Sequence, residues 1–251
     1  MRFALMLGAA ALALSACSQS ADNGSAPANG TAAAPATGGA AIPPPAGKEW
    51  SDVVTALPEG GMRMGNPDAP VKLVEYLSLT CPHCAEFARE GFEKLRDQYV
   101  KKGTVSLEVR NYVRDPIDMT LTLVSRCGGP EPYFAMTEQA LATQNEIFDR
   151  AQKADQAAVQ ALQSQAPAQQ FQGLARLLGF DAFARQRGIA EARLDQCLAD
   201  KAMTDQLIAM QKTANDELKI PGTPAFFLNG QLLEATGTWE QLEPKLKAAG
   251  A

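Results

Sequence analysis

The chain has 251 residues, 46% of them hydrophobic and 20% charged, and its formal net charge at pH 7 is −5. This is enough for one sizeable hydrophobic core, or for one domain with a large insertion. Because the charge is modestly negative and no long run of like charge occurs, we do not expect nucleic acid as a partner.

The first sixteen residues, 1–16, have the pattern of a signal peptide. Arg2 supplies a positive start, and the apolar run that follows is too short to span a bilayer. The run ends in LSAC, which resembles the lipobox of bacterial lipoproteins. That resemblance implies cleavage before Cys17 and acylation of Cys17. The alternative is an ordinary secretory signal that is cleaved at a small residue nearby.

Residues 17–47 are expected to be a lipid-anchored, disordered linker. They consist mainly of Ala, Gly, Pro, Ser, Thr and Asn, so they cannot bury enough apolar surface to offset the entropy of ordering. Thirty flexible residues have an end-to-end distance of roughly 30 Å. We therefore expect a periplasmic, membrane-anchored lipoprotein. Ser18, after Cys17, points weakly toward the outer membrane of the cell envelope.

The chain contains five cysteines: Cys17, Cys81, Cys84, Cys127 and Cys197. Without Cys17 four remain, and an exported protein meets an oxidising compartment, so two disulfides are plausible among three possible pairings. The short-range choice pairs Cys81 with Cys84 and leaves Cys127 with Cys197. The long bridge would contribute roughly 4 kcal/mol in the chain-entropy model. The short bridge removes little chain entropy, so reactivity is its expected use.

His83, which lies between Cys81 and Cys84, is the only histidine of the sequence. A closed structural zinc site needs four ligands, and these three neighbours are too crowded to point inward together. We therefore expect no metal. A Cys–His or Ser–His hydrolase is disfavoured because the sequence holds no second base that could orient the histidine.

Residues 71–77, VKLVEYL, are nearly apolar on both faces, which predicts a central strand of a covered sheet. Glu75 is then expected in a buried place, unless it reaches solvent at an edge. An amphipathic helix should follow, and Cys81 should lie in its first turn, where Pro82 is tolerated. The apolar face of this helix comprises Ala88, Phe92, Leu95 and Tyr99.

Residues 104–112 alternate as a second strand, and the long connection predicts a parallel crossover. Residues 115–219 read as a helical insertion that contains Cys127 and Cys197, so their bridge would join two helices. Residues 226–228 and 231–233 should form a hairpin around an Asn-Gly turn. A last helix should begin with a capping box of Thr238 and Gln241, with a kink or a later start at Pro244.

A thiolate is the species that attacks a disulfide, and a helix N-terminus favours negative charge. The pKa of Cys81 should therefore be low, and a nearby His83 can lower it further. Cys84, one turn further into the helix, should be less exposed and act as the resolving cysteine. Glu75 is the candidate acceptor of the Cys84 proton, because burial would raise its pKa toward a useful value.

Several stretches resemble the DsbA family of periplasmic thiol oxidases. They are CPHC after an apolar strand, its lead-in GNPDAPVKLVEYLSLT, and GTPAFFLNG near the end. The resemblance, over about residues 48–249, implies an α/β thioredoxin-like fold with an inserted helical domain. The fold would use residues 48–114 and 220–251, with 115–219 inserted. It also implies that Glu75 is the buried acid, that Pro224 is a cis-proline facing the disulfide, and that the backbone of Thr223 pairs with substrate.

The leading hypothesis is a dithiol oxidase whose Cys81–Cys84 disulfide oxidises exported proteins. The family implies a DsbB-like, quinone-linked membrane partner that restores the disulfide, and no dissolved cofactor is needed. One alternative is a disulfide isomerase or reductase, with Thr223 before the proline as a mild point in its favour. Because the low-complexity start cannot build a dimerisation domain, we expect a monomer. The other alternative is a non-catalytic chaperone, against which the intact Cys81 and Cys84 argue.

Overall fold

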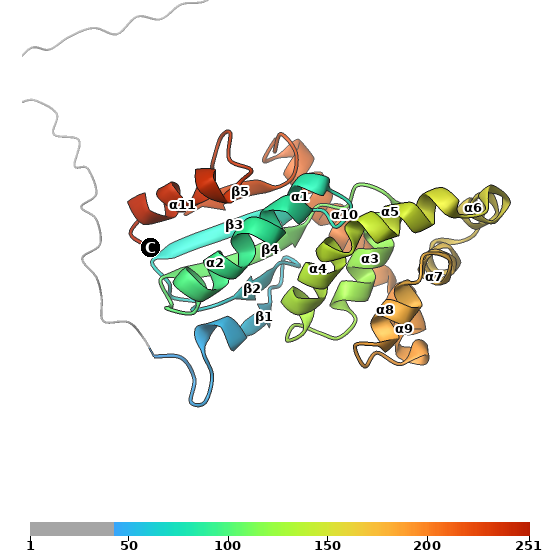
Figure 1. Ribbon diagram of the computed structural model, residues 1–251, viewed down its shortest axis with the longest axis horizontal. Helices are drawn as coiled ribbons and strands as arrows, with labels where there is room; N and C mark the ends of the chain where they lie inside the picture. The colour runs from blue at the N-terminus through green and yellow to red at the C-terminus, as the bar shows by residue number, and fades with distance from the viewer. Residues whose placement is uncertain (1–42) are drawn as a thin grey trace, which may run out of the picture. The chain divides into compact units, whose positions relative to one another are not determined.

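The computed structural model describes residues 43–251, which belong to one compact unit (Figure 1). The predicted signal peptide, Cys17 and residues 17–42 of the predicted linker lie outside the described residues. The last five linker residues, 43–47, lie inside them, and the Lys48 N–H closes a turn there on the Pro45 carbonyl at 3.0 Å. Within the described part of the chain, no helix is both long and apolar enough to cross a membrane.

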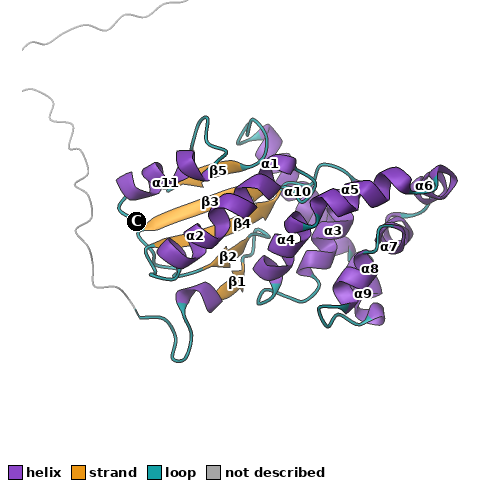
Figure 2. Cartoon of the chain, viewed as in Figure 1, coloured by secondary structure: helices purple, strands orange, loops and turns teal. Residues whose placement is uncertain are grey.

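Six strands form one mixed sheet in the order β1-β2-β4-β3-β5-β6 (Figure 2). Strands β3 and β4 are parallel, and the other neighbours pair antiparallel. The parallel crossover is therefore confirmed. The short strands β1 and β2 were not predicted, because three residues are too few to show an alternation. The strands are β1 (Val54–Ala56), β2 (Met62–Met64), β3 (Val71–Leu77), β4 (Val105–Asn111), β5 (Ala225–Leu228) and β6 (Gln231–Leu232).

Strand β3 is central and is covered on both faces, as its sequence predicts. Leu73 and Leu77 are buried on the face that also carries Glu75, within the main core. Tyr76 points to the other face and packs in a second cluster with Met210 of α10 (Lys201–Asp216). Glu75 is 1% exposed, so the alternative that it reaches solvent at an edge is wrong.

The helix after β3 begins at Pro82, and Cys81 is its N-cap residue rather than a residue of its first turn. The helical stretch continues to Val100 through two π-helical segments. It comprises α1 (Pro82–Phe87), η2 (Ala88–Phe92), α2 (Glu93–Leu95) and η3 (Arg96–Val100). Phe92, Leu95 and Tyr99 are buried, as the predicted apolar face requires, and Ala88 is partly buried.

The predicted insertion is helical and is divided into separate helices. One break lies at Thr143 and another near Asp200, whose side chain accepts a hydrogen bond from the Met203 N–H at 3.0 Å and so caps the next helix. The helices are α3 (Pro116–Arg126), α4 (Tyr133–Ala142), α5 (Gln144–Lys153), α6 (Gln156–Gln163), α7 (Pro167–Leu177), α8 (Phe180–Arg185), α9 (Glu191–Leu198) and α10.

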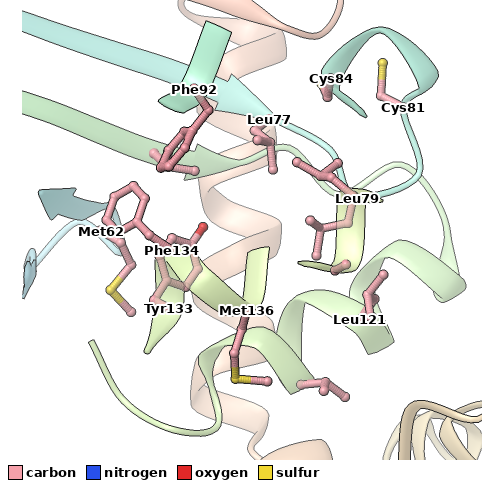
Figure 3. Close-up of a cluster of buried hydrophobic side chains, with 14 of the residues drawn as sticks. Met62, Leu77, Leu79, Cys81, Cys84, Phe92, Leu121, Tyr133, Phe134 and Met136 are labelled. Atoms are coloured by element: carbon pink, nitrogen blue, oxygen red, sulfur yellow. The ribbon is translucent and has the colours of Figure 1, made fainter. Parts of the chain in front are cut away.

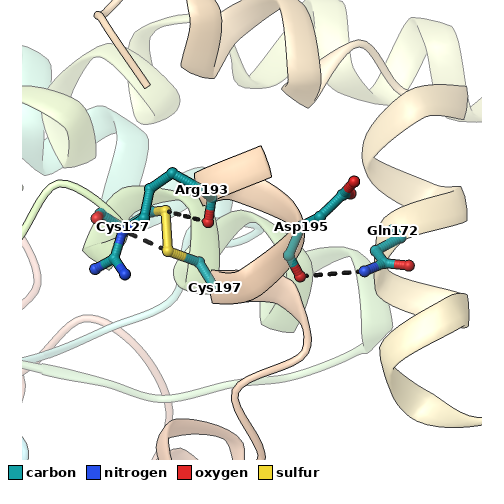
Figure 4. The surroundings of a disulfide bond; sticks show 5 residues. All are labelled: Cys127, Gln172, Arg193, Asp195 and Cys197. Atoms are coloured by element: carbon teal, nitrogen blue, oxygen red, sulfur yellow. Dashed lines mark hydrogen bonds between the residues drawn. A yellow bond between two sulfur atoms is a disulfide. The ribbon is translucent and has the colours of Figure 1, made fainter. Parts of the chain in front are cut away.

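A disulfide joins Cys127, which follows α3, to Cys197 in α9 (Figure 4). It bridges two helical segments that are 70 residues apart in the chain. The sheet and the insertion also share one continuous core, in which the ring of Phe92 stacks on that of Phe134 of the insertion with centroids 6.1 Å apart (Figure 3). The insertion is therefore packed onto the thioredoxin-like part and has no separate core of its own.

The C-terminal segment contains the predicted hairpin, in which Asn229 and Gly230 connect β5 to β6 with positive φ at both residues. Helix α11 (Trp239–Ala248) begins at the predicted capping box of Thr238 and Gln241. It runs through Pro244, so the expectation of a later start is wrong. The proline has no N–H to donate, so one intrahelical hydrogen bond is missing, but the helix continues on both sides of it.

Candidate active site around Cys81 and Cys84

The two cysteines of CPHC lie where the loop after β3 enters α1 (Figure 3). Cys81 is 4% exposed and Cys84 is fully buried, so Cys84 is the less accessible of the two, as expected. Both are free thiols in this structure. Pro82 is the first residue of the helix, where a missing N–H costs no intrahelical hydrogen bond.

The second segment of the site is the loop before β5. The Cys81 Sγ donates a hydrogen bond to the Thr223 carbonyl oxygen at 3.1 Å, and the Thr223–Pro224 peptide bond is cis. Both loop residues are partly exposed, and Gly222 beside them is exposed. The structure thus brings together Cys81, Thr223 and Pro224, which the sequence places in two distant motifs.

The environment of Cys81 favours its thiolate. The pKa of Cys81 is lowered from 9.0 to about 5. The largest cause is a hydrogen bond from the Cys84 thiol, which burial opposes, and the Thr223 side chain and the backbone N–H groups of Cys84 and His83 lower it further. These N–H groups belong to the first turn of α1, where the Cys84 N–H also donates to the carbonyl oxygen of the N-cap residue Cys81 at 3.1 Å.

The pKa values of Cys84 and Glu75 are raised, in the direction opposite to that of Cys81. Burial raises the pKa of the Cys84 thiol, and its hydrogen bond to Cys81 raises it further. Burial also raises the pKa of Glu75 from 4.5 to about 8, with a smaller contribution from the negative charge of Cys81. The Oε1 atom of Glu75 has no hydrogen-bond partner among the described residues. The site therefore combines a thiol whose pKa is lowered with two buried groups whose pKa values are raised.

The His83 side chain does not point at Cys81 in this structure. It is 78% exposed, and its Nδ1 lies 3.7 Å from Oε2 of Glu86. The effect of His83 on the pKa of Cys81 comes from its backbone N–H. Residue 83 lies on the outer side of the helix turn in this structure, and assistance to Cys81 by the imidazole itself stays a prediction.

Two buried side chains that sequence reasoning missed bind the loop before Cys81. Asp118, near the start of α3, accepts hydrogen bonds from the Ser78 hydroxyl at 2.6 Å and the Leu79 N–H at 2.9 Å. Gln144, the first residue of α5, donates to the carbonyl oxygens of Leu79 and Cys81. The Asp-Pro start of α3 is a signal for a helix N-terminus but not for this contact, and Gln144 has no sequence signal.

A groove of about 700 Å³ lies next to the site, between the active-site helix and the insertion. Its lining includes Pro82 and Gln144, and Glu86, Arg89 and Glu138 contribute polar groups. No group of three or more potential ligands that could hold a metal ion occurs within residues 43–251.

Comparisons with known proteins agree with this geometry. A family model described as Thioredoxin matches residues 58–248, so the chain belongs to the thioredoxin family. A crystal structure of a protein-disulfide isomerase from Novosphingobium aromaticivorans is 33% identical, with a TM-score of 0.72. The match covers 76% of this chain and 98% of that one. The predicted thioredoxin-like fold with a helical insertion is confirmed.

A second solved structure, Wolbachia pipientis α-DsbA1, shares the fold at 21% identity, with a TM-score of 0.60. The match covers 74% of this chain and 89% of that one. A Rickettsia bellii protein, provisionally named a protein-disulfide oxidoreductase, is 26% identical over 178 residues, which are 71% of this chain and 60% of that protein. The chain spans 54% to 60% of the length of the curated relatives that it matches. The resemblance to DsbA-like proteins is therefore confirmed at the level of fold and family.

Proposed function

We propose that the chain is a thiol:disulfide oxidoreductase that oxidises cysteine pairs in exported proteins through a Cys81–Cys84 disulfide. The observation that carries the proposal is the opposite shift of the two thiols, with the pKa of Cys81 lowered to about 5 and that of Cys84 raised. A stabilised thiolate favours the reduced form of the pair, so the disulfide form is the stronger oxidant. It also makes Cys81 a good leaving group.

The transfer is a two-electron exchange in two steps. A substrate thiolate attacks Sγ of Cys81, the Cys81–Cys84 bond breaks, and Cys84 leaves and takes up a proton. A second substrate thiolate then attacks the substrate sulfur of the mixed disulfide and releases Cys81 as a thiolate. The substrate pair has lost two electrons, and the protein pair ends in its reduced form, with Cys81 as a thiolate and Cys84 as a thiol.

We assign Glu75 as the group that accepts the proton of Cys84. Its carboxyl is buried, and its charge raises the pKa of Cys84, so the two groups are electrostatically coupled. The Cys81 thiolate contributes to the raised pKa of Glu75. In the mixed disulfide that negative charge is gone, so Glu75 ionises more easily. More of it is then in the carboxylate form that can accept the Cys84 proton, at the step in which Cys84 attacks and resolves the mixed disulfide.

We assign substrate binding to the loop that contains Thr223 and Pro224. Among the described residues the Thr223 N–H forms no backbone hydrogen bond, and its carbonyl oxygen lies 3.1 Å from the reactive sulfur. An extended peptide can pair with such exposed backbone groups while its cysteine meets Cys81. We further propose periplasmic anchoring through Cys17 and reoxidation by a DsbB-like, quinone-linked membrane protein. The Cys127–Cys197 bridge is assigned a structural role.

An isomerase or reductase is the second candidate. Two observations favour it: the threonine before Pro224, and the name of the 33% identical relative of known structure, which is called a protein-disulfide isomerase. The same site serves both activities, because an isomerase also attacks with a thiolate. The difference lies in whether the pair is more stable as a disulfide or as two thiols.

The reduction potential of the Cys81–Cys84 pair tests the proposal. The protein is equilibrated with glutathione buffers, and trapped thiols are counted by mass spectrometry. A potential above about −180 mV, that of protein disulfide isomerase, supports the oxidase; a value near about −270 mV, that of thioredoxin, overturns it. If Cys127–Cys197 also titrates in this range, its assigned structural role is wrong. A non-catalytic chaperone would instead keep its full activity in Cys81→Ser.

A further inference from the structure

The loop from Ser78 to Cys81 is buried, and side chains of the helical insertion bind its polar groups. Leu79 is completely buried, and Ser78 and Thr80 are buried beside it. A buried backbone N–H or C=O without a partner is costly, so each of these groups needs a specific partner. The insertion supplies partners on both sides of the loop.

Gln144 binds the loop from α5. It is 3% exposed, and its Nε2 donates to the carbonyl oxygen of Leu79 at 2.9 Å and to that of Cys81 at 3.1 Å. A primary amide has two N–H donors, and both are used here. The side chain therefore fixes the peptide group that directly follows the reactive cysteine.

Asp118 binds the same loop from α3. It accepts the Ser78 hydroxyl and the Leu79 N–H, and its Oδ2 also accepts the Arg114 N–H at 3.0 Å. The backbone of Leu79 is thus held on both sides: its N–H donates to Asp118, and its carbonyl oxygen accepts from Gln144. Both side chains belong to helices of the insertion, α3 and α5, and lie outside the strands of the sheet.

These contacts act on the first turn of α1. The Cys81 carbonyl oxygen accepts the Cys84 N–H at 3.1 Å and the Ala85 N–H at 3.2 Å as well as the Gln144 amide. The backbone N–H groups of His83 and Cys84 in that turn stabilise the Cys81 thiolate. If the carbonyl oxygen shifts, the N–H groups that face the sulfur shift with it.

We propose that Gln144 is a positioning residue for Cys81, through which the helical insertion, with Asp118 on the opposite side of the loop, sets the reactivity of the thiolate. The inference rests on the proposed redox role of Cys81. It assigns a chemical task to the insertion, in addition to its share of the core.

The test compares Gln144→Leu with Gln152→Leu, an exposed glutamine of the same helix, as the matched control. Leucine is similar in size and removes both donors. The thiolate of Cys81 is followed by its absorbance near 240 nm during a pH titration. In Gln144→Leu the acid dissociation constant of Cys81 should fall about tenfold. The equilibrium constant for oxidation of glutathione by the pair should fall in parallel, which is about 30 mV in potential. Gln152→Leu should change neither.

Two further variants separate positioning from packing. Gln144→Glu keeps the shape but replaces the donor, so it should raise the pKa of Cys81 at least as much as leucine does. Asp118→Asn keeps the loop packed but loses one acceptor, so it should also raise the pKa of Cys81. The proposal is overturned if Gln144→Leu and Gln144→Glu both fold and keep the acid dissociation constant of Cys81 within twofold of the wild-type value. If Gln144→Leu does not fold, the proposal is overturned when Asp118→Asn keeps that constant within twofold. A reducing potential in the wild-type protein would instead overturn the oxidase function and leave these differences between variants intact.

Discussion

The Sγ atom of Cys81 lies 3.1 Å from the carbonyl oxygen of Thr223, although 142 positions separate the two residues in the chain. The antiparallel pairing of β3 with β5, in which Glu75 lies opposite Phe226 and Tyr76 opposite Ala225, brings their loops together at one end of the sheet. A reactive thiol and an open backbone edge therefore form one site, with the helical insertion on its other side.

The pH dependence of Cys81 should be that of an unusually acidic thiol. With a pKa of about 5, its alkylation by iodoacetamide should be half-maximal near pH 5 and level above pH 7. A midpoint near 9.0, the ordinary thiol value, would contradict the structure. Cys81→Ser should abolish disulfide transfer, while Cys84→Ser should still be alkylated at Cys81 and accumulate mixed disulfides with substrate.

The same low pKa makes the reduced protein depend on pH for its stability. The unfolded chain keeps the Cys81 proton up to about pH 9, whereas the folded chain releases it near pH 5. The thiolate contribution is therefore complete above pH 9 and is lost as the pH falls through 5. Urea unfolding of reduced wild-type protein and of Cys81→Ser should show a difference that grows between these limits. A constant difference would contradict this prediction.

Glu75→Gln should stabilise the protein and slow its chemistry. The folded pKa of Glu75 is about 8 against 4.5, so the ionised form is disfavoured in the fold and wild-type stability falls as the pH rises between these values. The variant should gain up to about 3 kcal/mol at pH 7 in urea unfolding, and almost nothing near pH 4. An equal gain at both pH values would indicate a change in packing instead.

The kinetic effect of Glu75→Gln is measured on the mixed disulfide. A glutamine cannot take the Cys84 proton, so release of a Cys81-bound substrate by attack of Cys84 should slow by about 100-fold, the lower end of general acid–base contributions. The formation of the mixed disulfide by Cys81 should change far less. If the two steps slow equally, Glu75 has no specific role in the resolving step.

Removal of the second disulfide should destabilise the protein. The bridge of Cys127 and Cys197 closes a loop of 70 residues, which corresponds to roughly 4 kcal/mol in the chain-entropy model. Cys127→Ala combined with Cys197→Ala should therefore lower the free energy of unfolding by about 2–4 kcal/mol in guanidinium denaturation. Unchanged stability would mean that the insertion is held by its core packing alone.

The aromatic contact beneath the site should contribute strongly to stability. Phe226 is completely buried in β5, and its ring centroid lies 4.7 Å from that of Phe87 in α1. Phe226→Ala should lower the free energy of unfolding by about 3–5 kcal/mol. The control is Ile208→Ala on α10, where the isoleucine is 50% exposed and the loss should stay below about 0.5 kcal/mol. Similar losses in both variants would contradict this assignment of the core.

Local signals in the sequence determined much of the fold and the reactive groups. The apolar run of β3, the alternation of β4 and the Asn229-Gly230 turn depend on neighbouring residues, so each was predictable by pattern. Cys81 and Cys84 were found in the same way, because their motif is contiguous, whereas Glu75 was found from the apolar strand that carries it and Pro224 from the resemblance of its stretch to a known family. The outward direction of the His83 ring was not, since it depends on where residue 83 falls on the helix.

Only the tertiary structure decided which distant groups meet. The three-residue strand β2 pairs with the edge of β4, and β1 pairs in turn with β2, although no local pattern marks either strand. Gln144 and Asp118 reach the loop before Cys81 from 63 and 39 residues away, through hydrogen bonds that an isolated segment cannot form. The sequence by itself thus determined which residues are the candidates for the redox chemistry. Long-range packing decided which buried partners hold them in place, because such contacts depend on the whole chain folding around the loop.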